Sequence, residues 1–193
     1  MGAGRALRIT GGSLKGRIIP VPPGKIRPAM DRMRESIFAV LGDLSGASFL
    51  DFFSGSGIIA LEAASRGAAH LEAVETDPGK RKILIGNAAL SPVRIHCRFM
   101  AVELYIKRAR RPFDYIFCDP PFAYQFKTEL INSIGSSLLM NETSLLMIHR
   151  PATERIGELT GSKGLVLQET RVYGNSSVDF LSKKKKLDSC SDN

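Results

Sequence analysis

The stretch Asp119-Pro120-Pro121-Phe122 combines residue types that could bind a planar amine. The apolar, aromatic-rich residues 113–118 precede it and predict a fully buried strand. Proline has a fixed φ and no N–H, so the chain leaves this strand stiffly and offers two acceptors, the Asp119 carboxylate and the Pro120 carbonyl. With Phe122 as a flat apolar face, these acceptors suit the exocyclic amine of a nucleobase. The same four residues would also fit a plain strand followed by a proline-rich turn.

Two further acidic residues, Asp51 and Glu75, stand at the ends of predicted strands, and Gly55-Ser56-Gly57 follows the first of them. Ligands of open α/β sheets bind beyond the carboxyl ends of the strands. Residues 55–60 also fit the dinucleotide pattern G-x-G-x-x-A, with Glu75 placed 20 residues after the first glycine, so a nicotinamide-dependent enzyme is an alternative. Asp51 would repel a pyrophosphate but attract the ammonium and sulfonium of S-adenosylmethionine (SAM). We therefore expect SAM as the cofactor, with Glu75 accepting hydrogen bonds from its ribose.

An alternation of strands and helices surrounds these residues and predicts an α/β fold. The expected strands are 48–52, 71–75, 93–97, 113–118 and 144–149, and the expected helices are about 57–66, 78–90, 101–109 and 126–139. Two last strands, 164–172 and 177–182, should form a hairpin through Gly174-Asn175. The pattern predicts a Rossmann-like, mostly parallel seven-stranded sheet with one antiparallel strand and helices on both faces.

Before this alternation, the sequence predicts a small extension with short strands at 7–9 and 17–19, followed by a helix at 30–42. We expect residues 1–29 to form a basic β-hairpin extension, residues 30–182 the main domain, and residues 183–193 a disordered basic tail.

The net charge of +8 is concentrated at the two ends of the chain. Residues 1–35 hold eight basic residues against two acidic ones, residues 183–193 hold four against two, and residues 36–182 are balanced at 15 of each sign. This segregation indicates a neutral catalytic body with a basic arm for a polyanion, although a merely solvated surface is the alternative. The candidate RNA-binding residues are Arg8, Lys15, Arg17, Arg27, Arg32 and Arg34.

The remaining composition excludes several classes of protein. Three cysteines without a C-x-x-C motif favour a reducing compartment, and the three histidines have no metal-ligand spacing, so no metal site is expected. The sequence has no apolar run of 18 residues and no hydrophobic segment after Met1, so we expect a cytoplasmic protein without a membrane span.

Taken together, the motifs resemble those of the RsmD family, the 16S rRNA (guanine-N2)-methyltransferases, over nearly the whole chain. They are Arg8-Ile9-Thr10-Gly11-Gly12 with Gly16-Arg17, Arg27–Glu35, Asp51–Gly57, Leu61-Glu62-Ala63, Ser65-Arg66-Gly67-Ala68, Asp119-Pro120-Pro121-Phe122 and Tyr173-Gly174-Asn175-Ser176. The first two are specific to the family, whereas the glycine turn and Asp-Pro-Pro-Phe recur across amino-methyltransferases.

The resemblance implies a class I SAM-dependent methyltransferase, acting as a monomer on one guanine of 16S rRNA in an assembled or assembling small ribosomal subunit. It implies a catalytic set of Asp119, Pro120, Pro121 and Phe122, and a cofactor-binding set of Asp51, Phe53, Ser54, Gly55, Gly57, Glu75 and Ala101. The sequence departs from the family pattern twice, with Ala29-Met30 in place of Thr-Thr and with Met100-Ala101 where an acid or amide usually precedes the alanine.

The motif itself does not choose the base. Adenine-N6 or another amine on nucleic acid would meet the same two acceptors, and a catalytically weak rRNA-binding assembly factor could keep the fold.

Overall fold

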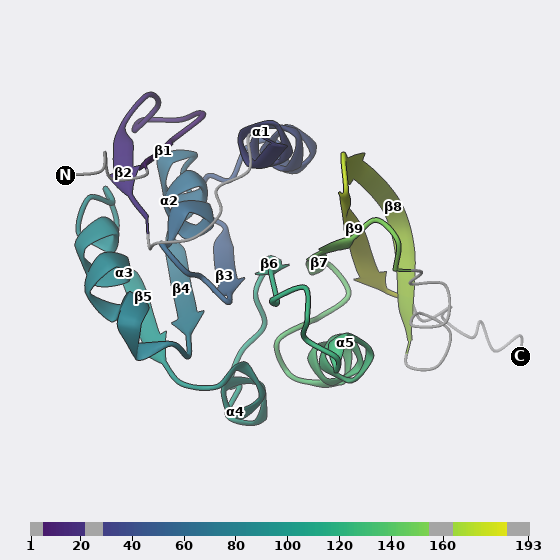
Figure 1. Ribbon diagram of the computed structural model, residues 1–193. Helices are drawn as coiled ribbons and strands as arrows, with labels where there is room; N and C mark the ends of the chain where they lie inside the picture. The colour runs from purple at the N-terminus through teal and green to yellow at the C-terminus, as the bar shows by residue number, and fades with distance from the viewer. Residues whose placement is uncertain (1–5, 22–28, 155–163, 185–193) are drawn as a thin grey trace, which may run out of the picture.

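A single large β-sheet, covered by helices on both faces, organises the chain (Figure 1). The computed structural model describes residues 6–21, 29–154 and 164–184. The strands are β1 (Ala6–Arg8), β2 (Ile18–Pro20), β3 (Ser48–Phe52), β4 (His70–Glu75), β5 (Ile95–Phe99), β6 (Tyr115–Cys118), β7 (Leu145–Pro151), β8 (Leu165–Tyr173) and β9 (Ser176–Lys183). The helices are α1 (Ala29–Leu41), α2 (Ile58–Ser65), the 3-10 turn η1 (Pro78–Lys80), α3 (Arg81–Ala88), α4 (Val102–Lys107) and α5 (Lys127–Ser136).

The predicted sheet is confirmed. Its strand order is β5-β4-β3-β6-β7-β9-β8, with parallel pairing from β5 through β7. Strand β9 runs antiparallel to both of its neighbours, β7 and β8, and is the one antiparallel strand. The chain moves from β3 outward to β5 and then returns to the other side of β3 as β6, so the strand order reverses between β3 and β6.

Two hydrophobic layers enclose the sheet, because alternate residues of each strand face opposite sides. One layer unites β1, β2, α1, α2 and α3 and includes the buried Phe49 and Phe117. The other unites α4 and α5 and includes Leu50 and Ile116, which are the sequence neighbours of Phe49 in β3 and of Phe117 in β6. The near-continuous apolar character of β3 and β6 in the sequence follows from this burial on both faces.

The observed strand ends lie within two residues of the predicted ones, and two of the differences have an identifiable cause. β5 covers residues 95–99 rather than 93–97, because the turn around Pro92 ends only after Arg94 and Ile95 is the first residue to pair, opposite Leu71. β6 begins at Tyr115, since the backbone N–H of Asp114 donates to the Ser48 hydroxyl at 2.9 Å, a side-chain partner, rather than to the backbone of a neighbouring strand. The carboxyl ends of β3, β4 and β6, where ligands are expected, lie at Phe52, Glu75 and Cys118 as predicted.

The β1–β2 hairpin packs against the main sheet layer rather than standing apart as an arm. Ile9 and Ile19 are fully buried in the same hydrophobic cluster as α1 and α2. The hairpin loop docks on the last residue of α2, where the Ser65 carbonyl accepts from Ser13 N at 2.7 Å. Gly12 has a positive φ of 74°, and a Cβ there would lie 1.9 Å from this carbonyl oxygen, so only glycine fits.

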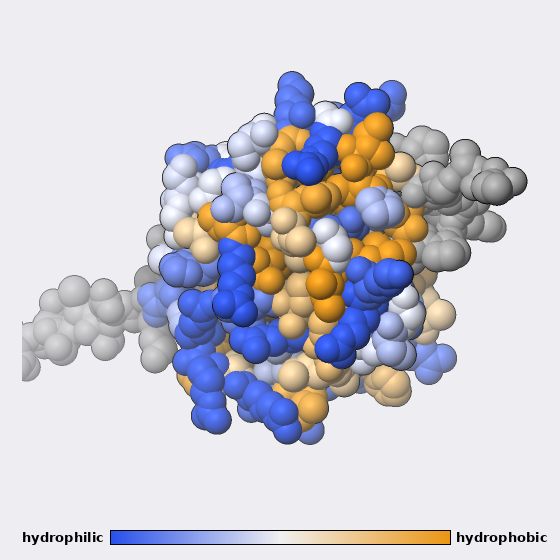
Figure 2. All heavy atoms as spheres, turned by 90° about the vertical axis from the view of Figure 1, so that its left-hand side faces the viewer, coloured by the Kyte–Doolittle hydropathy of each residue, from blue (hydrophilic) through white to orange (hydrophobic). Residues whose placement is uncertain are grey.

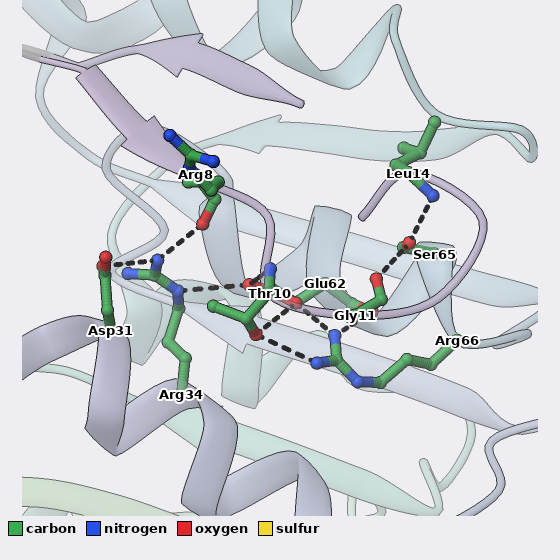
Figure 3. A network of polar contacts seen from close by, with 9 residues as sticks. All are labelled: Arg8, Thr10, Gly11, Leu14, Asp31, Arg34, Glu62, Ser65 and Arg66. Carbon is green, nitrogen blue, oxygen red and sulfur yellow. Dashed lines mark hydrogen bonds and ion pairs between the residues drawn. The ribbon is translucent and has the colours of Figure 1, made fainter. Parts of the chain in front are cut away.

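A buried carboxylate on α2, Glu62, fastens the hairpin and α1 together (Figure 3). It accepts hydrogen bonds from the backbone N–H of Thr10 at 2.7 Å and from Nε of Arg34 at 3.3 Å, and it forms an ion pair with Arg66. The Arg34 guanidinium also donates to the carbonyl oxygen of Arg8 at 2.8 Å. Three segments far apart in sequence therefore share one buried charge.

The two ends of the main domain meet at Ser36 of α1. Its hydroxyl lies 3.0 Å from Nη1 of Arg171 and 2.7 Å from the hydroxyl of Tyr173, both on β8. Among the described residues, no helix is both long enough and apolar enough to cross a bilayer.

Candidate active site

The candidate site lies where the strand order reverses, at the carboxyl ends of β3 and β6. The two strands pair in parallel with Phe52 opposite Cys118, and the backbone N–H of Asp119 donates to the Phe52 carbonyl at 3.3 Å. The glycine turn after β3 and the Asp-Pro-Pro-Phe stretch after β6 are thus neighbours. This is the location at which open α/β sheets bind their ligands.

The turn between β3 and α2 has a strained backbone held by Asp51. Phe53 is the one described non-glycine residue with a positive φ, 59°, and Gly55 and Gly57 also have positive φ values. The buried Asp51 carboxylate accepts from the Ser54 hydroxyl at 2.6 Å and from the backbone N–H of Ala60 at 3.3 Å. Strain of this kind gathers at ligand sites when surrounding contacts fix it.

Glu75, at the end of β4, reaches across to the same turn. Its Oε2 accepts from the backbone N–H of Gly55 at 2.8 Å, and its Oε1 accepts from the N–H groups of Thr76 and Asp77. Lys80 lies 3.5 Å from Oε2. The carboxylate is therefore fixed beside the glycine turn, where the ribose of a bound nucleoside is expected.

Three carboxylates, those of Asp51, Glu75 and Asp119, gather around this turn and make it favourable for a cation. Burial, and then the charges of Asp119 and Glu75, raise the pKa of Asp51 to about 7, against the lowering effect of its two hydrogen bonds. A ligand with an ammonium and a sulfonium would relieve this repulsion, whereas a pyrophosphate would add to it. The residues present fit SAM and disfavour the dinucleotide alternative.

Asp119 is paired with a residue that the motifs did not indicate, His149 near the end of β7. Nδ1 of His149 lies 2.7 Å from Oδ1 of Asp119, and a carboxylate can only accept, so Nδ1 donates. The Asp119 side chain is 32% exposed while that of His149 is 9% exposed, so the carboxylate faces outward from a buried partner. The His149 ring also contacts the Phe122 ring edge-on, with centroids 5.4 Å apart.

The loop after Asp119 is fixed by a second unexpected residue, Lys127 at the start of α5. Its buried ammonium donates to the carbonyl oxygens of Phe122 and Tyr124 at 2.9 and 2.8 Å and pairs with Glu154 at 2.9 Å. The Tyr124 ring in turn packs edge-on against Phe53 of the glycine turn, with centroids 5.7 Å apart. Lys127 therefore holds the Phe122 segment against the other half of the site.

The remaining predicted cofactor residue, Ala101, follows β5 directly as the N-cap of α4. Its carbonyl oxygen accepts from the N–H groups of Leu104 and Tyr105 and so begins the helix. The side chain is exposed at the carboxyl end of β5, next to β4 and Glu75. This position is compatible with a backbone contact to an adenine.

The structure separates the predicted RNA-binding residues into three groups. Arg8, Lys15, Arg17 and Arg32 have exposed side chains, while Arg27 lies outside the described residues. The prediction for Arg34 is wrong, because its side chain is 0% exposed and its guanidinium is bound to Glu62, Asp31 and the Arg8 carbonyl. Arg34 stabilises the fold and cannot reach a phosphate.

The fold and the site define a class I SAM-dependent methyltransferase, with an acidic glycine turn beside the Asp-Pro-Pro-Phe segment. Residues 7–182 match the family model described as Conserved hypothetical protein 95. The chain belongs to this family, the RsmD family that its motifs resemble.

Related proteins and solved structures agree with this assignment. The chain is 34% identical over 146 residues to the Ribosomal RNA small subunit methyltransferase D of Escherichia coli K12, covering 74% of this chain and 73% of that protein. It is 28% identical over 156 residues to the protein of the same name from Buchnera aphidicola, covering 77% and 80%. The structure of the Escherichia coli protein yhhF superimposes with a TM-score of 0.82 at 28% identity, over 94% of this chain and 100% of that one.

Because the pKa of Asp51 is about 7, SAM affinity should depend on pH. A nearby cation favours the ionised carboxylate, so binding should strengthen about tenfold between pH 6 and pH 8 and release up to one proton near pH 6. Calorimetry in buffers of different ionisation enthalpy measures both quantities. Asp51→Asn should remove the proton release, and an unchanged release in that variant would assign the titration to another group.

Proposed function

We propose that this methyltransferase transfers a methyl group from SAM to the exocyclic N2 amine of a guanine in small-subunit rRNA. The observation that carries the proposal is the adjacency of the acidic glycine turn and the Asp119–Phe122 segment at the point where the strand order reverses. The relatives named rRNA small subunit methyltransferase D support rRNA as the substrate. The choice of guanine N2 rests on the family motifs.

The chemistry requires an activated amine, because the lone pair of an exocyclic amine is delocalised into the base. SAM, when bound, supplies an electrophilic methyl group. The Asp119 carboxylate and the Pro120 carbonyl would accept the two N–H groups of the amine and turn its lone pair outward. Positive charge develops on this nitrogen as its bond to the methyl group forms, and the Asp119 carboxylate would stabilise that charge until the nitrogen loses a proton to water.

The surrounding residues position these acceptors. His149 engages one Asp119 oxygen, which orients the carboxylate, and the buried Lys127 fixes the carbonyl groups of Phe122 and Tyr124. Phe122 would stack on the target base, and contacts of this type contribute about 1–3 kcal/mol per base. The base must leave its stack to reach this segment, so we expect a loop guanine or one that is extruded.

A radiolabelled methyl-transfer assay tests the proposal. Small subunits and free 16S rRNA, both prepared without the native methylation, would be incubated with the protein and labelled SAM. Nucleoside analysis should then yield N2-methylguanosine. Recovery of N6-methyladenosine would change the base, and absence of transfer to either substrate, with SAM bound normally, would favour a non-catalytic assembly factor.

We further propose that the substrate is an assembled or assembling small subunit in the cytoplasm, and that the enzyme acts as a monomer. Faster methylation of subunits than of free rRNA would support the first point. Sedimentation analysis of the protein alone tests the second.

The exposed basic residues of the β1–β2 hairpin provide a separate prediction. Their loop docks on the last residue of α2, whereas the glycine turn precedes the first, so about 12 Å of helix separates the two. The triple substitution Arg8→Ala, Lys15→Ala and Arg17→Ala should weaken rRNA binding and lower its salt slope by up to about 0.7–0.9 log unit for each phosphate that the protein no longer neutralises. SAM affinity should stay unchanged, and an unaltered salt slope would exclude the hairpin from the RNA surface.

A further inference from the structure

A group of arginines lies along the β5 edge of the sheet. The net charge of residues 36–182 does not indicate this group, because acidic residues elsewhere balance it. β5 is the edge strand, and two hollows flank it, one of about 550 Å³ beside α3 and one of about 320 Å³ beside α4. Five arginines and a single glutamate line the two hollows: Arg94, Arg98, Arg108, Arg110 and Arg111, with Glu72. We call these arginines the β5-edge surface.

Figure 2 views the molecule from the side that carries α3 and β5. Long hydrophilic side chains project from this side around a band of hydrophobic surface. Arg98 lines both hollows, so the basic side chains continue around the sheet edge from one face to the other.

Glu72 orients two of these arginines. Its Oε2 accepts from Nε of Arg98 at 2.8 Å, and its Oε1 lies 3.6 Å from Nη2 of Arg111. The Arg111 guanidinium also lies 5.0 Å from the centre of the Phe113 ring. Both arginines are about half exposed, at 47% and 48%, so anchored guanidinium groups still face solvent. Pre-oriented guanidinium groups of this kind suit phosphate, which they can bind with two parallel hydrogen bonds.

The other three arginines pair with no carboxylate in the part of the chain that the structure describes. Arg94, Arg108 and Arg110 are exposed and form no ion pair within residues 6–21, 29–154 and 164–184. Concentrated positive charge on a protein whose body is balanced overall is the electrostatic footprint of nucleic-acid binding.

We propose that the β5-edge surface binds the sugar–phosphate backbone of the rRNA substrate, and this inference rests on the proposed function. Strands β5 and β6 are separated by β4 and β3, which places them on the order of 15 Å apart at a strand spacing of about 4.8 Å. Arg94, Arg108 and Arg110 precede β5 and β6, whereas Asp119 follows β6, so the length of a strand, roughly 15 Å, adds to this distance and the backbone of a few nucleotides must span about 20 Å. An RNA whose target base reaches Asp119 can therefore also contact this edge. The surface would bind flanking phosphates without reading their sequence.

The test removes the three arginines without ion pairs, so that folding is preserved. Arg94→Ala, Arg108→Ala and Arg110→Ala together should weaken rRNA binding about 10- to 100-fold at 0.1 M salt and reduce the salt slope by about two to three phosphate equivalents. SAM affinity and the unfolding midpoint should match those of the unaltered protein. The matched control, Lys183→Ala with Lys184→Ala and Lys185→Ala, removes three consecutive positive charges that begin at the last residue of β9, on the far side of β7 from β5.

Unchanged rRNA affinity and salt slope in the β5-edge variant would overturn the inference, and so would an equal loss in the control, which would assign the effect to net charge. Neither result bears on methyl transfer by the unaltered protein. The unaltered protein could also fail to methylate any rRNA while the β5-edge variant shows the expected loss of rRNA binding. That result would reject the proposed chemistry and retain the RNA-binding surface.

Discussion

Replacement of Asp119 by alanine should lower the rate of methyl transfer by about 10²–10³-fold while leaving SAM affinity nearly unchanged. The carboxylate would stabilise positive charge that exists on the substrate nitrogen only during transfer, and loss of a single group of this kind typically has an effect of this size. Asp119→Asn keeps an acceptor but removes the charge, so its rate should lie between those of the alanine variant and the unaltered enzyme. Single-turnover measurements with labelled SAM determine both rates, and more than a tenth of normal activity in the alanine variant would exclude a catalytic role.

His149 provides a control for the orientation of this carboxylate. His149→Leu removes the 2.7 Å hydrogen bond to Oδ1, whereas an asparagine offers an N–H close to the position of Nδ1. If His149 acts by positioning Asp119, the leucine variant should lose kcat more than KM, and the asparagine variant should recover part of the loss. Equal activity of both variants with the unaltered enzyme would reduce His149 to a packing residue.

Replacement of Glu62 by leucine should destabilise the fold by about 3–5 kcal/mol, because, of the two carboxylates that pair with Arg34 among the described residues, it removes the fully buried one. The backbone N–H of Thr10 loses its acceptor at the same time. Urea unfolding measures the free energy of unfolding, and hydrogen exchange at Thr10 reports whether the hairpin is released. Glu129→Gln on the exposed side of α5 is the matched control and should change stability by less than about 0.5 kcal/mol.

The double variant Glu62→Leu with Arg34→Met distinguishes a buried ion pair from simple packing. Replacing both partners removes the uncompensated charge, so the double variant should be more stable than Glu62→Leu alone. The losses of stability caused by Glu62→Leu and Arg34→Met could instead add in the double variant, or the free energy of unfolding of Glu62→Leu alone could stay within about 1 kcal/mol of that of the unaltered protein. Either result would mean that the Glu62 carboxylate does not hold the hairpin and α1 together.

The sequence predicted the parts of the site that local pattern encodes. Asp51, Glu75 and Asp119 end strands that are recognisable from their own residues, and the rule for open sheets brings such strand ends to one edge. The mostly parallel seven-stranded sheet with one antiparallel strand followed from the alternation of strands and helices and the final turn at Gly174, whereas the order of the strands came from the structure. These features depend on neighbours in sequence.

His149, Lys127 and the role of Arg34 could not be predicted in the same way, because each depends on contacts between distant segments. Asp119 meets His149 only because β6 pairs with β7 in a register that sets Cys118 opposite Ile148, so the following residues also lie side by side. Arg34 has the residue type of a solvated helix face. Its burial depends on Glu62, 28 residues later, whose own position on an otherwise apolar helix was the available signal.

The contact of Ser36 with Arg171 and Tyr173 has a consequence for how the chain acquires its structure during synthesis. These partners are 135 and 137 residues apart in sequence, so α1 is made well before β8 and can meet it only after the residues between them have left the ribosome. Loops of this length make the closing contacts slow to form. Until the β8–β9 hairpin has been made, the nascent chain must therefore keep α1 and the unpaired edge of β7 from aggregating.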